Sequence, residues 1–382
     1  MTAPPPPAAD AVNKSDAIKP VTVLVCASPK AGRGQGREEI PKLVASLNEH
    51  GIKAIATDSI EVIRQHILRF QSNSDHSLIL VACGGDGTIS LLADLATPEI
   101  PIVPMPMGTE NLLARHFGFS GNADDVVQTI LQGHDFRIDA GSANGRLFLV
   151  MASCGFDAEV VRDVHLRRRG HIQRLSYLRP ILRAMSRYRF PKIDLRIESD
   201  ENVSNDAGES HRDAIKPAAE PAVPMPVAPV TDAAAADSPA STSEPESSAP
   251  DSSGPDSSEP NLSWQPCWAM VFNIPCYGGG LRIEPDAIEN DCLLDVITFY
   301  QGTILSGLRY VAGIFTGRHL GFADVRRQRA RRVVMTSKSR VAYQLDGDYV
   351  GRLPLEIRTL PGRVCLRMPV TADFSGRLSK PA

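Results

Sequence analysis

Strand-like runs alternate with helical patterns through the first third of the chain. The β-branched run at residues 21–27 precedes a glycine-containing loop and a helical pattern at 38–50. Further strand-like runs lie at 52–57, 78–82 and 102–105, and further helical patterns lie at 60–70, 89–96 and 111–117. Parallel strands joined by crossover helices satisfy this alternation, so the sequence predicts a doubly wound α/β domain over residues 20–138.

The pattern becomes mostly β from about Asp139 onward. Strand-like runs lie at 146–152, 192–197, 268–273, 293–299, 331–336 and 341–345, with few helical patterns between them. The exception is 172–188, where apolar side chains share one face and arginines fall mainly elsewhere, as in a basic amphipathic helix. The sequence therefore predicts a second, mostly β domain over residues 139–358.

Two segments have the composition of disordered chain. Residues 199–263 hold thirteen Asp and Glu against Arg212 and Lys216, and they are rich in Ser, Pro and Ala. Such a segment buries too little apolar surface to offset the entropy lost on ordering. We expect a disordered acidic insertion at 199–263, inside the second domain, and a disordered proline-rich tail at 1–19.

The rest of the chain is basic once the insertion is set aside. The formal net charge is −3, and the insertion alone contributes −11, which leaves about +8 on the remainder. A basic body suits an anionic partner, either nucleic acid or a phospholipid surface. Seven cysteines without C-x-x-C spacing fit a reducing cytosol, and we expect neither a signal peptide nor a membrane anchor.

A glycine-rich motif marks the candidate site. Gly84-Gly85-Asp86-Gly87-Thr88 follows the apolar run at 78–82, and Gly108-Thr109-Glu110-Asn111 follows the next strand-like run. Glycines let backbone N–H groups approach phosphate oxygens closely, and the aspartate and threonines add charge and hydroxyl groups where a strand gives way to a helix. This pattern is typical of nucleotide-dependent phosphoryl transfer.

Ordered motifs along most of the chain resemble the diacylglycerol kinase catalytic family, which includes bacterial soluble lipid kinases and the sphingosine and ceramide kinases. The motifs lie at 23–34, 84–88, 105–115, 155–160, 277–280, 285–287, 293–296 and 345–348. The resemblance implies a nucleotide-binding α/β domain, a β-sandwich second domain and an active site in the cleft between them. It also implies that the C-terminal segment, 359–382, returns to the first domain.

The resemblance further implies a chemistry of Mg²⁺ and ATP, with transfer of phosphate to a lipid hydroxyl. The residues expected to bind the nucleotide are Ser28, Lys30, Gly32, Gly34, Gly84, Gly85, Gly87, Thr88, Gly108, Thr109 and Asn111. Asp86 and Asp348 are the catalytic candidates and the candidate Mg²⁺ ligands, with Asp86 our first choice for the base.

Other acidic residues match family positions near the site. Asp139, Asp157 and Glu159 are candidates for contacting the lipid substrate, and Asp291 is a candidate for a structural Mg²⁺ site. The family's late motif is commonly Asp-Gly-Glu, whereas this chain has Asp346-Gly347-Asp348. The same three residues also fit a tight hairpin turn.

These observations predict a cytoplasmic, peripherally membrane-associated lipid kinase, with diacylglycerol or a related glycerolipid as its acceptor and a sphingoid base as the second choice. Basic runs at 167–169 and 326–332 are candidates for contact with an anionic membrane. The resemblance favours that partner over nucleic acid, and a homodimer is compatible with the sequence. The alternatives are an NAD kinase, which shares the Gly-Gly-Asp-Gly core, and an inactive membrane-binding scaffold.

Overall fold

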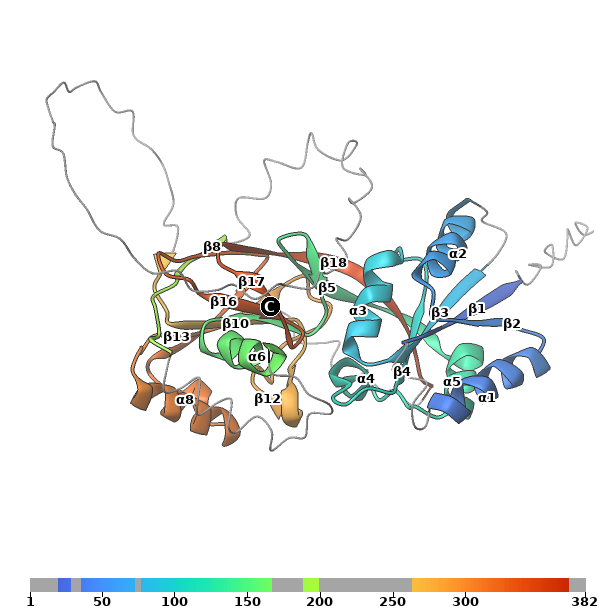
Figure 1. The fold of residues 1–382 in the computed structure, drawn as a ribbon, viewed down its shortest axis with the longest axis horizontal. Coiled ribbons are helices and arrows are strands. Elements are labelled where there is room, and N and C mark those ends of the chain that lie inside the picture. Colours follow the sequence, from blue (N-terminus) through green and yellow to red (C-terminus); the bar gives the residue numbers. More distant parts are fainter. Residues whose placement is uncertain (1–19, 29–35, 73–76, 167–187, 199–262, 371–382) are drawn as a thin grey trace, which may run out of the picture. The chain divides into compact units, whose positions relative to one another are not determined.

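A computed structural model describes residues 20–28, 36–72, 77–166, 188–198 and 263–370 (Figure 1). The two segments expected to be disordered lie outside these residues, apart from Ser263, and so does nearly all of the basic amphipathic helix expected at 172–188. Among the described residues, no helix is both long enough and apolar enough to cross a membrane.

The first domain is built on four parallel strands in the order β2-β1-β3-β4. These strands are β1 Val21–Ala27, β2 Lys53–Thr57, β3 Ser77–Gly84 and β4 Ile102–Pro106. The helices are α1 Gly36–Glu49, α2 Ile60–Ser72, α3 Asp86–Leu95, α4 Leu112–His116 and α5 Ala123–Gln132. In Figure 1, α2 and α3 lie on one side of the sheet and α1 and α5 on the other, so the domain is doubly wound, as predicted.

One long strand, β18, joins this parallel sheet to antiparallel strands of the second domain. β18, Leu355–Met368, pairs antiparallel with β5, His134–Ala143, and with β15, Arg332–Thr336. Its far end pairs parallel with β4, where Leu366 lies opposite Ile102. The sheet continues through β8, Asp194–Glu198, and β9, Ser263–Trp264, while β6, Arg146–Phe148, extends it from β5.

The second domain is a β-sandwich. Its second sheet is antiparallel, in the order β14-β13-β10-β7-β16-β17. Those strands are β7 Met151–Cys154, β10 Trp268–Phe272, β13 Leu294–Phe299, β14 Val325–Ala330, β16 Ala342–Leu345 and β17 Asp348–Arg352. A buried cluster that includes Leu195, Val333 and Ile357 of one sheet and Val271 and Val296 of the other fills the space between them. The predicted fold class, an α/β domain followed by a β-sandwich, is confirmed.

Several elements were not predicted. α6, Phe156–Leu166, and α8, Ile304–Phe315, follow strands of the sandwich, and the short strands β11, Cys276–Tyr277, and β12, Leu281–Arg282, form a separate ribbon. α8 begins at a capping box made by Thr303 and Ser306. β14 has four exposed polar residues between a buried valine and a buried alanine, which is why its sequence reads as a basic run rather than as a strand.

Leu366 tests the role of β18 in joining the domains, because its side chain is fully buried where β18 meets both β4 and β5. We expect Leu366→Ala to lower the free energy of unfolding by about 2–5 kcal/mol, since it leaves a cavity in the core. Leu68→Ala on α2 is the matched control, because Leu68 is 60% exposed, and its effect should stay within about 0.5 kcal/mol. Equal effects in urea unfolding would contradict this account of β18.

Candidate functional site

The two glycine-rich loops of the first domain touch each other through their backbones. A Cβ atom built on Gly108 would lie 2.8 Å from the Cα atom of Gly85, and one built on Gly84 would lie 2.2 Å from the Thr88 hydroxyl. Glycine is therefore required at these positions by close packing. The β3–α3 and β4–α4 loops form one continuous backbone surface at the carboxyl ends of the strands, where α/β sheets bind their ligands.

Asn111 fastens the second of these loops. Its Oδ1 accepts a hydrogen bond from the Gly108 amide at 2.9 Å, and its Nδ2 donates to the Gly108 carbonyl at 2.8 Å. Asn111 is buried and has a positive φ of 49°, which asparagine tolerates better than most residues. Gly108 and Thr109 stay exposed, so Asn111 acts by shaping the loop that presents them.

Asp86, the first residue of α3, connects the two loops through its carboxylate. The carboxylate accepts hydrogen bonds from the Leu112 amide at 2.9 Å and the Leu113 amide at 3.0 Å, and so it caps the start of α4. Burial raises the pKa of Asp86, these amide bonds oppose the rise, and the nearby Glu110 charge adds to it. The carboxylate is thus fixed in position and holds a proton more readily than an exposed aspartate does.

Asp346 lies in the two-residue turn between β16 and β17. The φ angles of Asp346 and Gly347 are 49° and 87°, as a type I′ hairpin turn requires. Its buried carboxylate accepts hydrogen bonds from the amides of 149, 150 and 151 at 2.8–3.0 Å and from the Ser90 hydroxyl at 3.1 Å. Burial raises the pKa of Asp346 to about 6, and the charge of Asp86 adds to this rise.

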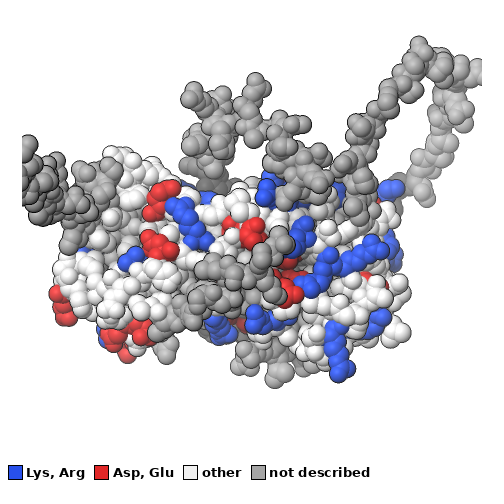
Figure 2. Space-filling view, turned by 180° about the vertical axis from the view of Figure 1, so that it is seen from behind, with Lys and Arg blue, Asp and Glu red and all other residues white. Residues whose placement is uncertain are grey.

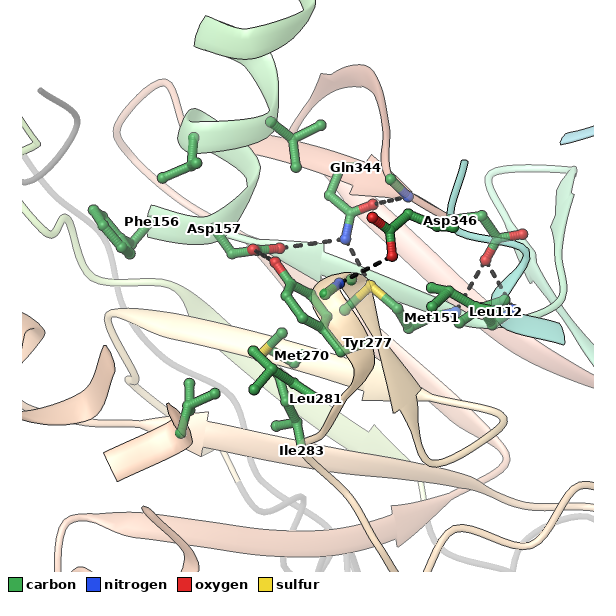
Figure 3. A pocket seen from close by; sticks show the side chains of 18 of the residues that line it. Leu112, Met151, Phe156, Asp157, Met270, Tyr277, Leu281, Ile283, Gln344 and Asp346 are labelled. Atoms are coloured by element: carbon green, nitrogen blue, oxygen red, sulfur yellow. Dashed lines mark hydrogen bonds between the residues drawn. The ribbon is translucent and has the colours of Figure 1, made fainter. Parts of the chain in front are cut away.

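Asp86 and Asp346 come from different domains and line the same pocket, whose volume is about 280 Å³ (Figure 3). Its remaining polar lining includes Glu110, Asp157, Tyr277 and Gln344. The rest of the wall is mostly apolar and includes Leu112, Val150, Met151, Phe156, Val160, Val161, Trp268, Met270, Leu281, Ile283, Val311, Ile314 and Phe315. The pocket therefore combines carboxylates with a surface suited to a hydrocarbon chain.

Asp157 is the centre of a buried polar network in this pocket. It accepts hydrogen bonds from the Ser153 hydroxyl, the Tyr277 hydroxyl and Gln344 Nε2, the last at 3.3 Å, and burial raises its pKa. The other end of the Gln344 amide accepts a hydrogen bond from the Gly347 amide at 2.8 Å. Gln344 thus connects Asp157 to the turn that carries Asp346. Neither Gln344 nor Tyr277 was predicted from the sequence to be a site residue.

Other predicted site residues lie outside the lining of this pocket. Asp348 is exposed at the start of β17, so the structure brings Asp346 rather than Asp348 to the pocket. Glu159 pairs with Arg162 at 2.9 Å. Asp139 is buried and accepts hydrogen bonds from the amides of Cys292 at 2.6 Å and Gly362 at 2.7 Å, which gives it a structural role.

Asp291, the candidate for a structural Mg²⁺ site, forms an ion pair with Arg329. No cluster of three or more His, Cys, Asp or Glu residues suited to a metal occurs among the residues that the structure describes. In the first loop predicted to bind nucleotide, the amide of Ser28 donates a hydrogen bond to the Cys83 carbonyl at 3.0 Å, whereas Lys30, Gly32 and Gly34 lie outside the described residues.

Both domains match known families. Residues 22–143 match the diacylglycerol kinase catalytic domain, and residues 257–368 match the YegS C-terminal NAD kinase beta sandwich-like domain. The α/β domain thus resembles diacylglycerol kinase catalytic domains, and the sandwich resembles the YegS C-terminal domain. The order of the two matches is the order of the α/β domain and the sandwich along the chain.

Two diacylglycerol kinases align with most or part of the chain. A diacylglycerol kinase of Mycobacterium tuberculosis strain H37Rv is 25% identical over 365 residues, covering 92% of this chain and 96% of that protein. One from Staphylococcus aureus strain MRSA252 is 27% identical over 183 residues, covering 46% and 56%. The crystal structure of a diacylglycerol kinase from Bacillus anthracis strain Sterne has a TM-score of 0.55 at 15% identity, covering 93% and 98%. At that identity the likeness shows a shared fold.

Asp346 and Asp348 form a matched pair for testing the turn. We expect Asp346→Asn to lower the free energy of unfolding by about 2–5 kcal/mol, because an amide cannot accept all the hydrogen bonds that the buried carboxylate accepts. Asp348→Asn should stay within about 0.5 kcal/mol, because Asp348 is exposed. Urea unfolding of both variants at pH 7 makes the comparison, and equal losses would contradict it.

The pH dependence of the same variant has a defined sign. The pKa of Asp346 is raised from 3.8 to about 6, so the folded protein binds this proton more tightly than the unfolded chain does. The stabilisation that the bound proton gives is lost as the pH rises through about 6. Asp346→Asn removes this dependence. The stability difference between wild type and variant should therefore be larger at pH 5 than at pH 7.

Proposed function

We propose that this protein is an ATP-dependent lipid kinase, which transfers the terminal phosphoryl group of ATP to the hydroxyl of diacylglycerol or a related lipid alcohol. The observation that carries the proposal is the position of Asp86. This residue directly follows the paired glycines of the β3–α3 loop, and its carboxylate lines a largely apolar pocket. One acid thus lies between a backbone surface suited to phosphate and a wall suited to hydrocarbon.

The nucleotide is proposed to bind along the two glycine loops. The exposed Gly87, Gly108 and Thr109 leave this backbone surface open, and α3 begins there with its partial positive charge directed at the loop. A triphosphate bound in this position has its terminal phosphate near Asp86. The match of residues 22–143 to a kinase catalytic domain supports ATP as the donor.

The acceptor is proposed to occupy the pocket, with its hydroxyl at Asp86. The Asp86 carboxylate accepts the hydroxyl proton as the oxygen attacks the terminal phosphorus, the bond from phosphorus to the bridging oxygen breaks, and ADP leaves. The amides of Leu112 and Leu113 hold the carboxylate in place during this step. The raised pKa of Asp86 makes it a better proton acceptor than an exposed aspartate.

Mg²⁺ is proposed to bind the same two carboxylates. Kinase sites bind this ion through one or two carboxylates together with the substrate phosphates, and Asp86 and Asp346 line one pocket. Asp346 takes the place given to Asp348 by the sequence analysis, because Asp348 does not line that pocket. When bound, the ion supplies positive charge to the phosphate oxygens.

The apolar wall favours a lipid over NAD as the acceptor. Trp268, Met270 and Ile283 form part of that wall, and a hydrocarbon chain gains free energy by leaving water to contact them, whereas a charged dinucleotide loses hydration. Among lipids, diacylglycerol is our first choice because the relatives that align along the chain are named diacylglycerol kinases. A sphingoid base is the second choice.

Asp86→Asn tests the catalytic assignment. The amide side chain cannot accept the proton, so we expect kcat for lipid phosphorylation to fall by about 10²–10⁴-fold. Activity is measured as labelled lipid formed from Mg²⁺, ATP and mixed micelles containing diacylglycerol. Asp94→Asn, on the exposed side of the same helix, is the matched control and should keep wild-type activity.

Two results would contradict the proposal. Full activity of the Asp86→Asn variant would show that Asp86 is not the general base. Phosphorylation of soluble NAD by the wild-type protein, with no product from any lipid alcohol, would identify an NAD kinase, and the absence of both activities would favour the inactive scaffold.

Glu110→Gln tests the electrostatics of the base. The Glu110 charge raises the pKa of Asp86, so its removal should lower that pKa and shift the acid side of the pH–kcat profile to lower pH. The amide oxygen of the substituted side chain can still accept the hydrogen bond that Gly279 donates to Glu110 at 3.1 Å. Glu61→Gln on α2 is the control, and a profile unchanged by Glu110→Gln would contradict the assignment of Asp86.

A further inference from the structure

α8 exposes a continuous apolar face. Ile304, Leu305, Leu308 and Phe315 are 51%, 78%, 43% and 63% exposed. They are four of the nine large apolar side chains that are exposed among the described residues. Positions 305, 308, 312 and 315 follow helical spacing, and Ala312 between them is also exposed, so these residues share one side of the helix.

The rest of α8 forms part of the pocket wall. Val311, Ile314 and Phe315 line the pocket described above, and Tyr310 is fully buried. Phe315 belongs to both sets, because it lines the pocket and is largely exposed. The apolar surface therefore continues without interruption from the outside of the molecule, around Phe315, to the interior of the pocket.

The exposed side of α8 carries little net charge. Its one charged residue, Arg309, forms an ion pair with Asp324, and its guanidinium group lies over the rings of Tyr310 and Phe322 at 5.3 and 4.7 Å. The first amides of a helix have no partner within the helix. At the start of α8, the side chains of Thr303 and Ser306 accept hydrogen bonds from each other's backbone amides, so these amides need no water. This helix can leave water at small electrostatic cost.

Two further cations lie outside α8 itself. Arg318 is exposed just after α8, and Arg282 is exposed on β12 beside the pocket residue Leu281. Three arginines of the basic run at 326–332, by contrast, are paired with acids. Figure 2 shows Lys and Arg gathered on one face of this domain with a few acidic side chains among them. The pairs are Arg327 with Glu284 and Asp286, Arg329 with Asp291 and Asp295, and Arg332 with Glu356.

We propose that α8 is a membrane-docking helix, which inserts its apolar face into the boundary between headgroups and acyl chains of an anionic phospholipid bilayer. Arg282 and Arg318 then contact lipid phosphates, while the substrate's acyl chain passes along Phe315 into the pocket. Continuity with the pocket favours a bilayer over a second copy of this chain, because a protein packed on α8 would cover that path. The route of the acyl chain rests on the proposed function, whereas docking does not.

Vesicle binding by the full-length protein tests docking directly. The probe is flotation with phosphatidylcholine vesicles containing phosphatidylglycerol, without nucleotide. We expect Leu305→Glu and Leu308→Glu each to lower the partition coefficient by about tenfold, the factor for removing one leucine from an apolar environment and charging it. Leu68→Glu on α2 is the matched control, because the exposure of Leu68, 60%, lies between those of Leu305 and Leu308, and its binding should be unchanged.

Charge and oligomeric state complete the test. Arg282→Glu and Arg318→Glu should each weaken binding by about fivefold or more on anionic vesicles only. Unchanged vesicle binding in the Leu305 and Leu308 variants would overturn the proposal. So would a wild-type dimer that Leu305→Glu separates into monomers, since a second copy would then occupy this face.

Activity separates this inference from the proposed function. The Leu305→Glu variant should lose activity on diacylglycerol in vesicles and keep activity on dioctanoylglycerol present as monomers, because it alters docking and not the pocket. If the wild type binds vesicles through α8 and phosphorylates no lipid, the proposed function fails and docking stands. If the variant loses both activities while its vesicle binding is unchanged, docking fails.

Discussion

The site depends on two buried carboxylates that are held by backbone amides. Asp86 binds the start of α4, and Asp346 binds the chain between β6 and β7 as well as Ser90 of α3. A buried carboxylate is costly unless hydrogen bonds replace its hydration, so each one determines the position of the segments that supply its donors. Because Asp346 belongs to the sandwich and Ser90 to the α/β domain, the hydrogen bond that Ser90 donates to Asp346 joins the two domains at the pocket.

Stability and chemistry are coupled through these groups. The structure compensates only part of the desolvation, since burial raises the pKa values of Asp86, Asp157 and Asp346 despite their hydrogen bonds. A carboxylate that retains proton affinity is what a general base requires. The site therefore gives up stability at neutral pH, and the large apolar cores on both sides of the pocket offset that loss.

The sequence predicted the fold well and the side chains of the site less well. The strands and glycine loops of the first domain were found because apolar periodicity and glycine spacing are local signals. Asp346 was missed as the inward-facing acid, because the positive φ angles of the turn, and not its spacing, determine which aspartate turns inward. The ion pair of Asp291 with Arg329 joins residues far apart in sequence. Gln344 did offer a signal, as a polar residue within the otherwise apolar run 342–345.

α8 was also missed. Its apolar residues occupy the face that packs on the sandwich and much of the face that meets solvent, so the helix is more apolar than a surface helix usually is. A helix that is apolar on both sides is normally buried in a core or in lipid. α8 is half-buried in protein, and its other half lacks a protein partner among the described residues. The proposed docking of α8 on a bilayer would provide that second apolar environment, and α8 also lines the pocket proposed for the lipid.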